Sequence, residues 1–165
     1  LGRLGGQVAK LGMAFGMSVQ AWSQNLTLDR CAEEGVSYAS KDDFFSTSDF
    51  ISIHLKLSDR VKGLVGAEQL AFMKPDAFLI NTSRASIIDQ PALLAALQEK
   101  RIGGAALDVY GQEPLPADDV LRGLPNVILT PHIGYVTAQT MTVFYGGMLE
   151  ALEAYLAGEP IRCLV

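Results

Sequence analysis

The chain contains few cysteines and histidines, the residues that are typical of disulfide-bonded and metal-binding proteins. It has only two cysteines, Cys31 and Cys163, and only two histidines among 165 residues. The cysteines form no C-x-x-C pair and have no metal-ligand spacing with the histidines, which argues against a disulfide framework or a metal site and favours a reducing compartment, the cytoplasm. No apolar run is long enough for a membrane span, and the amino end lacks the basic-then-apolar order of a signal peptide.

Positive charge is also scarce. Lys and Arg number 13 against 18 Asp and Glu, which gives a net charge of -5, and the basic residues form no cluster. This balance argues against nucleic acid or an anionic membrane as a partner. Hydrophobic residues, in contrast, make up 49% of the chain. That content and length suit one globular domain that buries roughly two thirds of the surface of its unfolded chain.

Short apolar segments alternate along the chain with segments of helical periodicity. Strands are predicted at residues 17–22, 36–39, 50–55, 77–82, 104–110 and 126–130. Helices are predicted at residues 8–15, 28–34, 41–45, 67–73 and 91–100. This alternation predicts βαβ units and a largely parallel sheet. A last segment, residues 137–157, predicts a long amphipathic helix, whose apolar face we expect to pack in the core rather than at a dimer or interdomain surface.

Three polar residues each follow a predicted strand. Arg84 comes after residues 77–82, Glu113 after residues 104–110 and His132 after residues 126–130. Because the carboxyl ends of parallel strands meet at one edge of a sheet, we expect the three side chains to converge there. A guanidinium binds carboxylates through two parallel N–H groups, and an imidazole near a carboxylate keeps a proton available near neutral pH. The set predicts redox or acid–base chemistry.

Each of these residues also has a simpler interpretation. Arg84 alone could be a surface arginine paired with Asp89, and Glu113 could merely cap a loop. A lone histidine such as His132 is more often a hydrogen-bonded structural residue than a catalyst. For His54, which also ends a predicted strand, we favour the structural role over a contact with cofactor or substrate.

Residues 1–6, Leu-Gly-Arg-Leu-Gly-Gly, match the last two glycines of a G-x-G-x-x-G dinucleotide loop. In such a loop, glycine lets the backbone approach a pyrophosphate and lets the helix pack closely on a strand. Taken alone, the segment could equally be an ordinary glycine turn. The acid expected roughly 20 residues later, at the ribose, is absent. Ser23 stands at that strand end with no adjacent arginine, so the choice between NAD and NADP stays open.

Together these ordered motifs resemble the nucleotide-binding domain of the D-isomer-specific 2-hydroxyacid dehydrogenases. The resemblance is carried by residues 2–5, 81–89, 108–114 and 131–134. It implies an α/β fold, a Rossmann-type doubly wound parallel sheet in three layers. It also implies hydride transfer between a nicotinamide cofactor, NAD or NADP, and the CH–OH group of a 2-hydroxy acid or the carbonyl of a 2-oxo acid.

The resemblance assigns a role to each candidate residue. Arg84 would bind the carboxylate and carbonyl of the substrate, His132 would be the general acid/base, and Glu113 would hold and tune His132. The implied contacts to the cofactor come from Gly2, Arg3, Leu4, Gly5, Ser23, Thr82, Asp108, His132 and Gly134. The family is usually dimeric, so a homodimer is expected. A non-catalytic, NAD-sensing module is the alternative, and the complete set of Arg84, Glu113 and His132 argues against it.

The chain departs from the family pattern in three ways. Ala85 stands where the family usually has glycine, and Ser23 replaces the usual acid. The strand before the glycine loop and the substrate domain are absent, so residues 1–165 are expected to be a fragment of the dinucleotide-binding domain. The missing first strand would lie between the strands at 17–22 and 50–55, and its absence would leave two open edges. In contrast to the core packing expected from the helix pattern alone, the resemblance implies that residues 137–165, the last helix and tail, pack toward the substrate domain. We expect the isolated chain to fold poorly and lack activity.

Overall fold

The computed structural model describes residues 1–163, which form two compact units that divide after His132. The helices of the first unit are α1 (Arg3–Ala14), α2 (Leu28–Glu33), α3 (Lys41–Thr47), α4 (Ala67–Phe72) and α5 (Gln90–Gln98), with the short 3-10 helices η1 (Ala85–Ile87) and η2 (Val120–Gly123). Its strands are β1 (Gln20–Ala21), β2 (Ser37–Tyr38), β3 (Phe50–Ile53), β4 (Phe78–Asn81), β5 (Gly104–Leu107) and β6 (Val127–Leu129). The predicted α/β alternation is confirmed.

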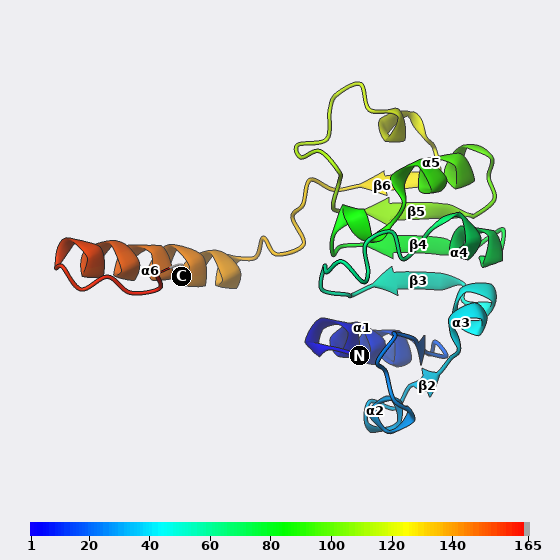
Figure 1. Ribbon diagram of the computed structural model, residues 1–165, viewed down its shortest axis with the longest axis horizontal. Helices are drawn as coiled ribbons and strands as arrows, with labels where there is room; N and C mark the ends of the chain where they lie inside the picture. Colours follow the sequence, from blue (N-terminus) through cyan, green and yellow to red (C-terminus); the bar gives the residue numbers. More distant parts are fainter. Residues whose placement is uncertain (164–165) are drawn as a thin grey trace. The chain divides into compact units, whose positions relative to one another are not determined.

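All strand pairs in the first unit are parallel. Strands β3, β4, β5 and β6 form one sheet in chain order (Figure 1). Strand β1 pairs with β2 in a separate two-stranded sheet. The break falls between β1 and β3, at the position predicted for the family's first strand. In a doubly wound sheet of order 3-2-1-4-5-6 with one more parallel strand after the last, strands 3 and 2 correspond to the two-stranded sheet, and the strands beyond the first correspond to the four-stranded sheet.

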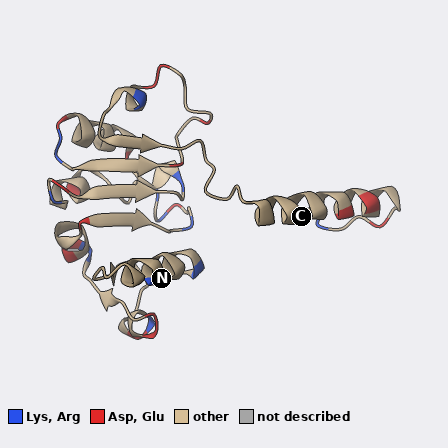
Figure 2. Cartoon of the chain, turned by 180° about the vertical axis from the view of Figure 1, so that it is seen from behind, with Lys and Arg blue, Asp and Glu red and all other residues tan. Residues whose placement is uncertain are grey.

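The core lies on one face of the four-stranded sheet. Strand residues such as Ile51, Leu79 and Leu107 are buried there against Leu70 of α4 and Leu93 of α5. Strands β3 to β6 carry no charged residue, and in Figure 2 the blue and red positions of charged residues lie on helices and loops. Burial of these uncharged strands provides the hydrophobic free energy that holds the strand ends, and the residues beyond them, in fixed positions.

Helix boundaries follow the local sequence. The side chains of Thr27, Ser40 and Asp89 accept hydrogen bonds from backbone N–H groups in the first turns of α2, α3 and α5, respectively. Helix α1 differs, because it begins directly after Gly2 without a side-chain cap and starts five residues earlier than predicted, at Arg3 rather than at residue 8. The glycine loop therefore opens straight into the helix.

The second unit consists mainly of α6 (Ala138–Leu156), which Thr137 caps at its amino end. After the helix the chain folds back, and the Arg162 guanidinium bonds the Gly147 carbonyl at 2.7 Å and Glu150 at 2.6 Å. No residue of α6 is buried, so the predicted packing of its apolar face in the core is wrong for the described residues. The reason is size: residues 133–163 contain no other element large enough to cover a helix of 19 residues. Over the described range, no helix combines the length and apolar character needed to cross a membrane.

Candidate active site

The carboxyl ends of β4, β5 and β6 surround a cleft of about 380 Å³. Arg84, Glu113 and His132 all line this cleft. The structure therefore brings together the three polar residues that the sequence predicted to converge. Four further residues complete the lining: Ala85, Ser86, Tyr110 and Gly111.

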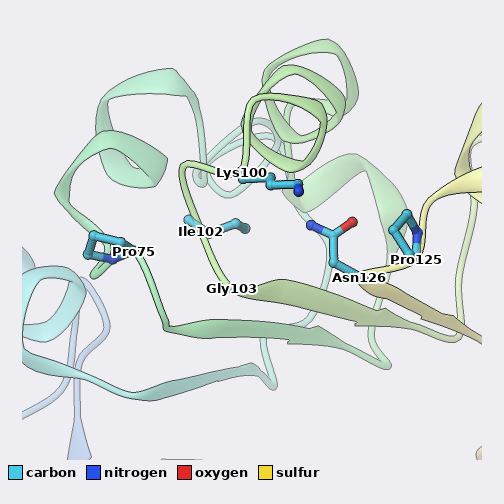
Figure 3. Close-up of a pocket in the computed structure, with 6 residues that line it drawn as sticks. All are labelled: Pro75, Lys100, Ile102, Gly103, Pro125 and Asn126. Atoms are coloured by element: carbon cyan, nitrogen blue, oxygen red, sulfur yellow. The ribbon is translucent and has the colours of Figure 1, made fainter.

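A second cleft of about 400 Å³ lies at the opposite, amino ends of the strands. Its lining consists of Pro75, Lys100, Ile102, Gly103, Pro125 and Asn126 (Figure 3). None of the predicted site residues lies in it. Parallel α/β sheets bind ligands at the carboxyl ends of their strands, so the cleft with Arg84, Glu113 and His132 is the candidate active site.

The turn after β4 fixes the backbone of Arg84. The buried Asn81 side chain accepts from the Ser83 backbone N–H and donates to the Arg84 carbonyl, both at 3.0 Å. Ser83 Oγ in turn donates to the Leu55 carbonyl beyond β3, at 2.5 Å. Asp89 caps α5 through the N–H of Ala92 rather than pairing with Arg84. The exposed guanidinium donates to the Ser83 carbonyl at 2.7 Å, which leaves further N–H groups directed at solvent for an anion.

Glu113 and His132 form a short contact across the cleft. Glu113 Oε2 lies 2.6 Å from His132 Nδ1, and Glu113 Oε1 accepts the backbone N–H of Tyr110 at 2.9 Å. The hydrogen bond from His132, followed by that from Tyr110, lowers the pKa of Glu113 below its ordinary value. The carboxylate is therefore ionised at neutral pH, and it favours a proton on Nδ1 of the imidazole.

The backbone of His132 has a conformation that is unusual for a residue other than glycine. Its φ is +54°, in the left-handed region, and its N–H donates to the Thr130 carbonyl at 3.0 Å. Such a residue costs on the order of 1–3 kcal/mol and persists only where its surroundings hold it in place. Strained residues of this kind cluster at active sites.

Sequence reasoning missed two residues that organise the cleft, Tyr110 and Thr130. The buried hydroxyl of Tyr110 lies 2.8 Å from the carbonyls of Leu107 and Thr130. Burial, the largest cause, raises the pKa of this phenol, which stays protonated. Thr130 Oγ1 donates to the buried Asp108 carboxylate at 2.5 Å. The available signal was a tyrosine inside an apolar run, because a buried Tyr hydroxyl nearly always has a partner.

The glycine loop has the features that a pyrophosphate site needs. Helix α1 has no side-chain cap and no acidic residue in its first turn, so its N–H groups can donate to a bound anion. A Cβ on Gly2 would meet open space, whereas one on Gly5 would lie 3.4 Å from His54 Cβ at the end of β3. Gly5 thus supplies the close helix–strand approach expected of the last loop glycine. The residues present fit a dinucleotide, and Arg3 and Leu4 begin the helix beside them.

His54 is half-buried against the glycine loop. Its Nε2 lies 2.9 Å from Ser52 Oγ, and burial lowers the pKa of the imidazole. The ring is therefore neutral at neutral pH. These contacts support the structural role that the sequence predicted.

The ribose end of the predicted cofactor site contains no unpaired cation from α2. Ser23 lies two residues beyond β1. The nearest arginine in sequence, Arg30, is bound by Glu33 at 2.9 Å and Glu34 at 2.6 Å, and its Nε lies 3.5 Å from the Leu1 carbonyl. A 2′-phosphate would have to compete with both carboxylates for this guanidinium.

Three other residues predicted to contact the cofactor are Thr82, Asp108 and Gly134. Thr82 is exposed at the end of β4, and Asp108 is buried at the end of β5, where its N–H donates to the Asn81 carbonyl at 3.0 Å. Gly134 lies in a turn of the second unit. Their contacts with a cofactor stay predictions.

Comparison with known proteins identifies a family for most of the chain. Residues 1–134 match the family described as D-isomer specific 2-hydroxyacid dehydrogenase, NAD binding domain. A glyoxylate reductase of Korarchaeum cryptofilum is 40% identical over 159 residues, which cover 96% of this chain and 48% of the reductase.

Solved structures agree with this match. The phosphoglycerate oxidoreductase of Vibrio cholerae superposes with a TM-score of 0.89 at 35% identity, over 96% of this chain and 51% of that one. The D-lactate dehydrogenase of Lactobacillus jensenii, solved with NAD+, has a TM-score of 0.80 at 30% identity, over 100% of this chain and 53% of its own. The chain thus spans about half the length of these three relatives.

Proposed function

The chain belongs to the D-isomer specific 2-hydroxyacid dehydrogenase family, and from this premise we propose that the whole protein is an NAD(P)-dependent oxidoreductase acting on small 2-hydroxy and 2-oxo acids. The observation that carries the proposal is the contact of 2.6 Å between Glu113 and His132 in a cleft that Arg84 also lines. A carboxylate-held imidazole beside a guanidinium matches a substrate with a carboxylate next to a carbonyl or hydroxyl.

Arg84 would bind and orient the substrate. Its guanidinium can bind the substrate carboxylate through parallel N–H groups and can also donate to the adjacent carbonyl oxygen. A donor at that oxygen stabilises the negative charge that develops there during reduction. Because the Asn81 side chain bonds the Arg84 carbonyl, the backbone that carries the guanidinium is held in a constrained turn.

His132 would move the proton. In reduction its Nε2 donates to the carbonyl oxygen of the 2-oxo acid, and in oxidation the same nitrogen takes the hydroxyl proton. The ionised Glu113 keeps a proton on Nδ1, so that Nε2 is the nitrogen that exchanges with substrate. A bound nicotinamide cofactor supplies or accepts the hydride. Gly2, Arg3 and Leu4 would lie at its pyrophosphate, and Gly5 would let the helix approach β3 closely. Ser23 would approach the ribose, and Thr82 and Asp108 would approach the nicotinamide. His132 and Gly134 are the other proposed contacts to the cofactor.

The proposal extends to the setting of the protein. We propose that the protein is a cytoplasmic homodimer. We also propose that residues 137–165, of which 164 and 165 lie outside the described residues, pack toward a substrate domain, because no residue of α6 is buried among the described residues. A non-catalytic NAD-sensing module has no support in the site, since a sensor has no need for the Glu113–His132 contact in a cleft with Arg84.

The test is turnover by the full-length protein. Absorbance of the reduced nicotinamide is followed with a panel of 2-oxo acids, using NADH and NADPH, for the wild type, His132→Ala and Arg84→Gln. Removal of a positioned acid/base lowers kcat by about 10² to 10⁴. We expect that loss in His132→Ala with cofactor affinity kept, and a raised KM in Arg84→Gln. Full kcat in His132→Ala, or no turnover of any 2-oxo acid by the wild type, would overturn the proposal.

A further inference from the structure

Tyr110 lines the candidate active site but has no part in the proposed chemistry. The side chain is buried, and its hydroxyl lies 2.8 Å from the carbonyl oxygens of both Leu107 and Thr130. Leu107 is the last residue of β5, and Thr130 directly follows the last residue of β6. The hydroxyl therefore joins the carboxyl ends of the two strands that lead to Glu113 and His132.

Hydrogen bonds connect Tyr110 with both members of the Glu113–His132 pair, directly with Glu113 and through the Thr130 carbonyl with His132. Its backbone N–H donates to Glu113 Oε1 at 2.9 Å, and Glu113 Oε2 lies 2.6 Å from His132 Nδ1. The backbone N–H of His132 donates at 3.0 Å to the Thr130 carbonyl, and this same carbonyl faces the Tyr110 hydroxyl. Tyr110 thus bonds Glu113 through its main chain, and its side chain bonds the Thr130 carbonyl to which the His132 backbone is also bonded.

We propose that Tyr110 is a positioning residue for the acid–base pair, whose hydroxyl holds the Thr130 carbonyl and thereby keeps the His132 imidazole within reach of Glu113. The left-handed backbone of His132 makes this support necessary, because a strained residue relaxes when the groups around it can move. If the Thr130 carbonyl shifts, the His132 N–H that bonds it shifts as well, and the imidazole moves away from the carboxylate.

Loss of the hydroxyl is expected to leave the fold intact. The Leu107 carbonyl also accepts the Thr130 backbone N–H at 3.0 Å, and the Thr130 carbonyl also accepts the His132 N–H. Neither carbonyl loses its last donor in a Tyr110→Phe variant, so no buried acceptor is left unpaired. The aromatic ring, which packs in the core, is also retained. The variant therefore separates positioning from folding.

The experiment compares the wild type, Tyr110→Phe and the matched control Tyr38→Phe in the full-length protein. Tyr38 lies on β2 and is 43% exposed. The first measurement is spectroscopic and needs no substrate: the resonance of the proton on Nδ1 of His132 in ¹⁵N-histidine-labelled protein, assigned by its loss in His132→Gln. The second is kcat, KM and cofactor affinity with the best 2-oxo acid of the panel, and the third is the melting temperature.

In Tyr110→Phe we expect the Nδ1 proton to exchange fast enough with water to broaden its resonance, while Tyr38→Phe keeps it sharp. Because a misplacement of about 1 Å costs up to about 10²-fold in rate, kcat should fall about 10- to 100-fold. KM, cofactor affinity and melting temperature should stay at wild-type values. An unchanged resonance, or a loss of kcat that follows a fall in melting temperature and cofactor affinity, would overturn the inference.

The catalytic part of this inference rests on the proposed function, and the two can fail separately. Absence of turnover in the wild type, together with a broadened Nδ1 resonance in Tyr110→Phe, refutes the oxidoreductase and supports the positioning role. Normal wild-type turnover, together with identical Nδ1 resonances in the two proteins, supports the oxidoreductase and refutes the positioning role.

Discussion

Replacement of Glu113 by glutamine tests the acid–base pair with the smallest change of shape. The carboxylate now accepts two hydrogen bonds, one from the Tyr110 N–H at 2.9 Å and one at His132 Nδ1, 2.6 Å away. The amide of glutamine has one acceptor oxygen and one donor NH₂. If its oxygen faces Tyr110, its NH₂ faces Nδ1 and forces the imidazole proton onto Nε2. If it is turned around, its NH₂ meets the Tyr110 N–H, a donor against a donor.

Either orientation removes a hydrogen bond to a charged group, which contributes about 1.5–3 kcal/mol. At about 1.4 kcal/mol for each tenfold change in rate, kcat in the Glu113→Gln variant should fall about 10- to 150-fold. This loss of kcat applies to both oxidation and reduction. Oxidation needs a free lone pair on Nε2, and reduction needs a protonated ring that the glutamine NH₂ disfavours. Affinity for the cofactor should not change, because the glycine loop and Ser23 are untouched.

The assay measures kcat for reduction and oxidation, with Glu99→Gln as the control. Glu99 lies just past α5, pairs with Arg101 and has a side chain that is 62% exposed, so its replacement should leave kcat unchanged. Equal kcat for Glu113→Gln and the wild type in both directions would refute the role of Glu113. Melting temperatures give a second check. The lowered pKa of Glu113 adds stability above the ordinary carboxyl value of 4.5, and this is lost as the pH falls through the lowered value. The glutamine variant should lack that component.

Three further predictions address the rest of the chain. Ser23→Asp should raise the ratio of kcat/KM for NAD to that for NADP, since a carboxylate binds ribose hydroxyls and repels a 2′-phosphate; an unchanged ratio refutes the assignment of Ser23. Burial lowers the pKa of His54, so as the pH falls below 6.5 the unfolded state binds a proton before the folded state does, and the stability decreases until the pH reaches the lowered value. The His54→Asn variant should therefore show a flatter plot of melting temperature against pH in that range. An unchanged slope would count against this role of His54. The isolated 165-residue chain should melt without cooperativity and show no turnover, because its two-stranded sheet is too small to be stable alone, so a sharp melt with normal kcat would contradict this reasoning.

The existence of the strands was predictable from the sequence, because apolar segments between turn signals are specified locally. The lengths of the strands were not predictable, because a strand extends only as far as a neighbouring strand is present to hydrogen-bond with it. The segment predicted at residues 17–22 narrows to Gln20–Ala21, which pairs with β2 on one side only. The segment predicted at residues 104–110 ends at Leu107. Beyond it, Asp108 and Tyr110 turn their side chains to Thr130, a contact between residues 20 or more apart that periodicity cannot reveal.

The convergence of Arg84, Glu113 and His132 was predictable from topology, since parallel strands place their carboxyl ends at one edge. The exposure of the α6 face was not. An amphipathic pattern specifies that one face of a helix needs cover, but it does not identify the covering element, and residues 133–163 contain none. The amphipathic pattern therefore predicted the helix correctly and its environment wrongly.

His132 is both the proposed acid/base and a residue whose left-handed backbone conformation lowers the stability of the fold locally. Glycine would adopt φ of +54° without the penalty that a side chain incurs, yet glycine has no imidazole. A histidine is held in this conformation only because neighbouring groups fix it: the Thr130 carbonyl at its N–H and the Glu113 carboxylate at its ring. Those partners are in turn fixed by Tyr110. The acid–base site is therefore a single coupled unit built on the ends of β5 and β6, and changes at Tyr110, Glu113 and Thr130 should affect the His132 ring together rather than additively.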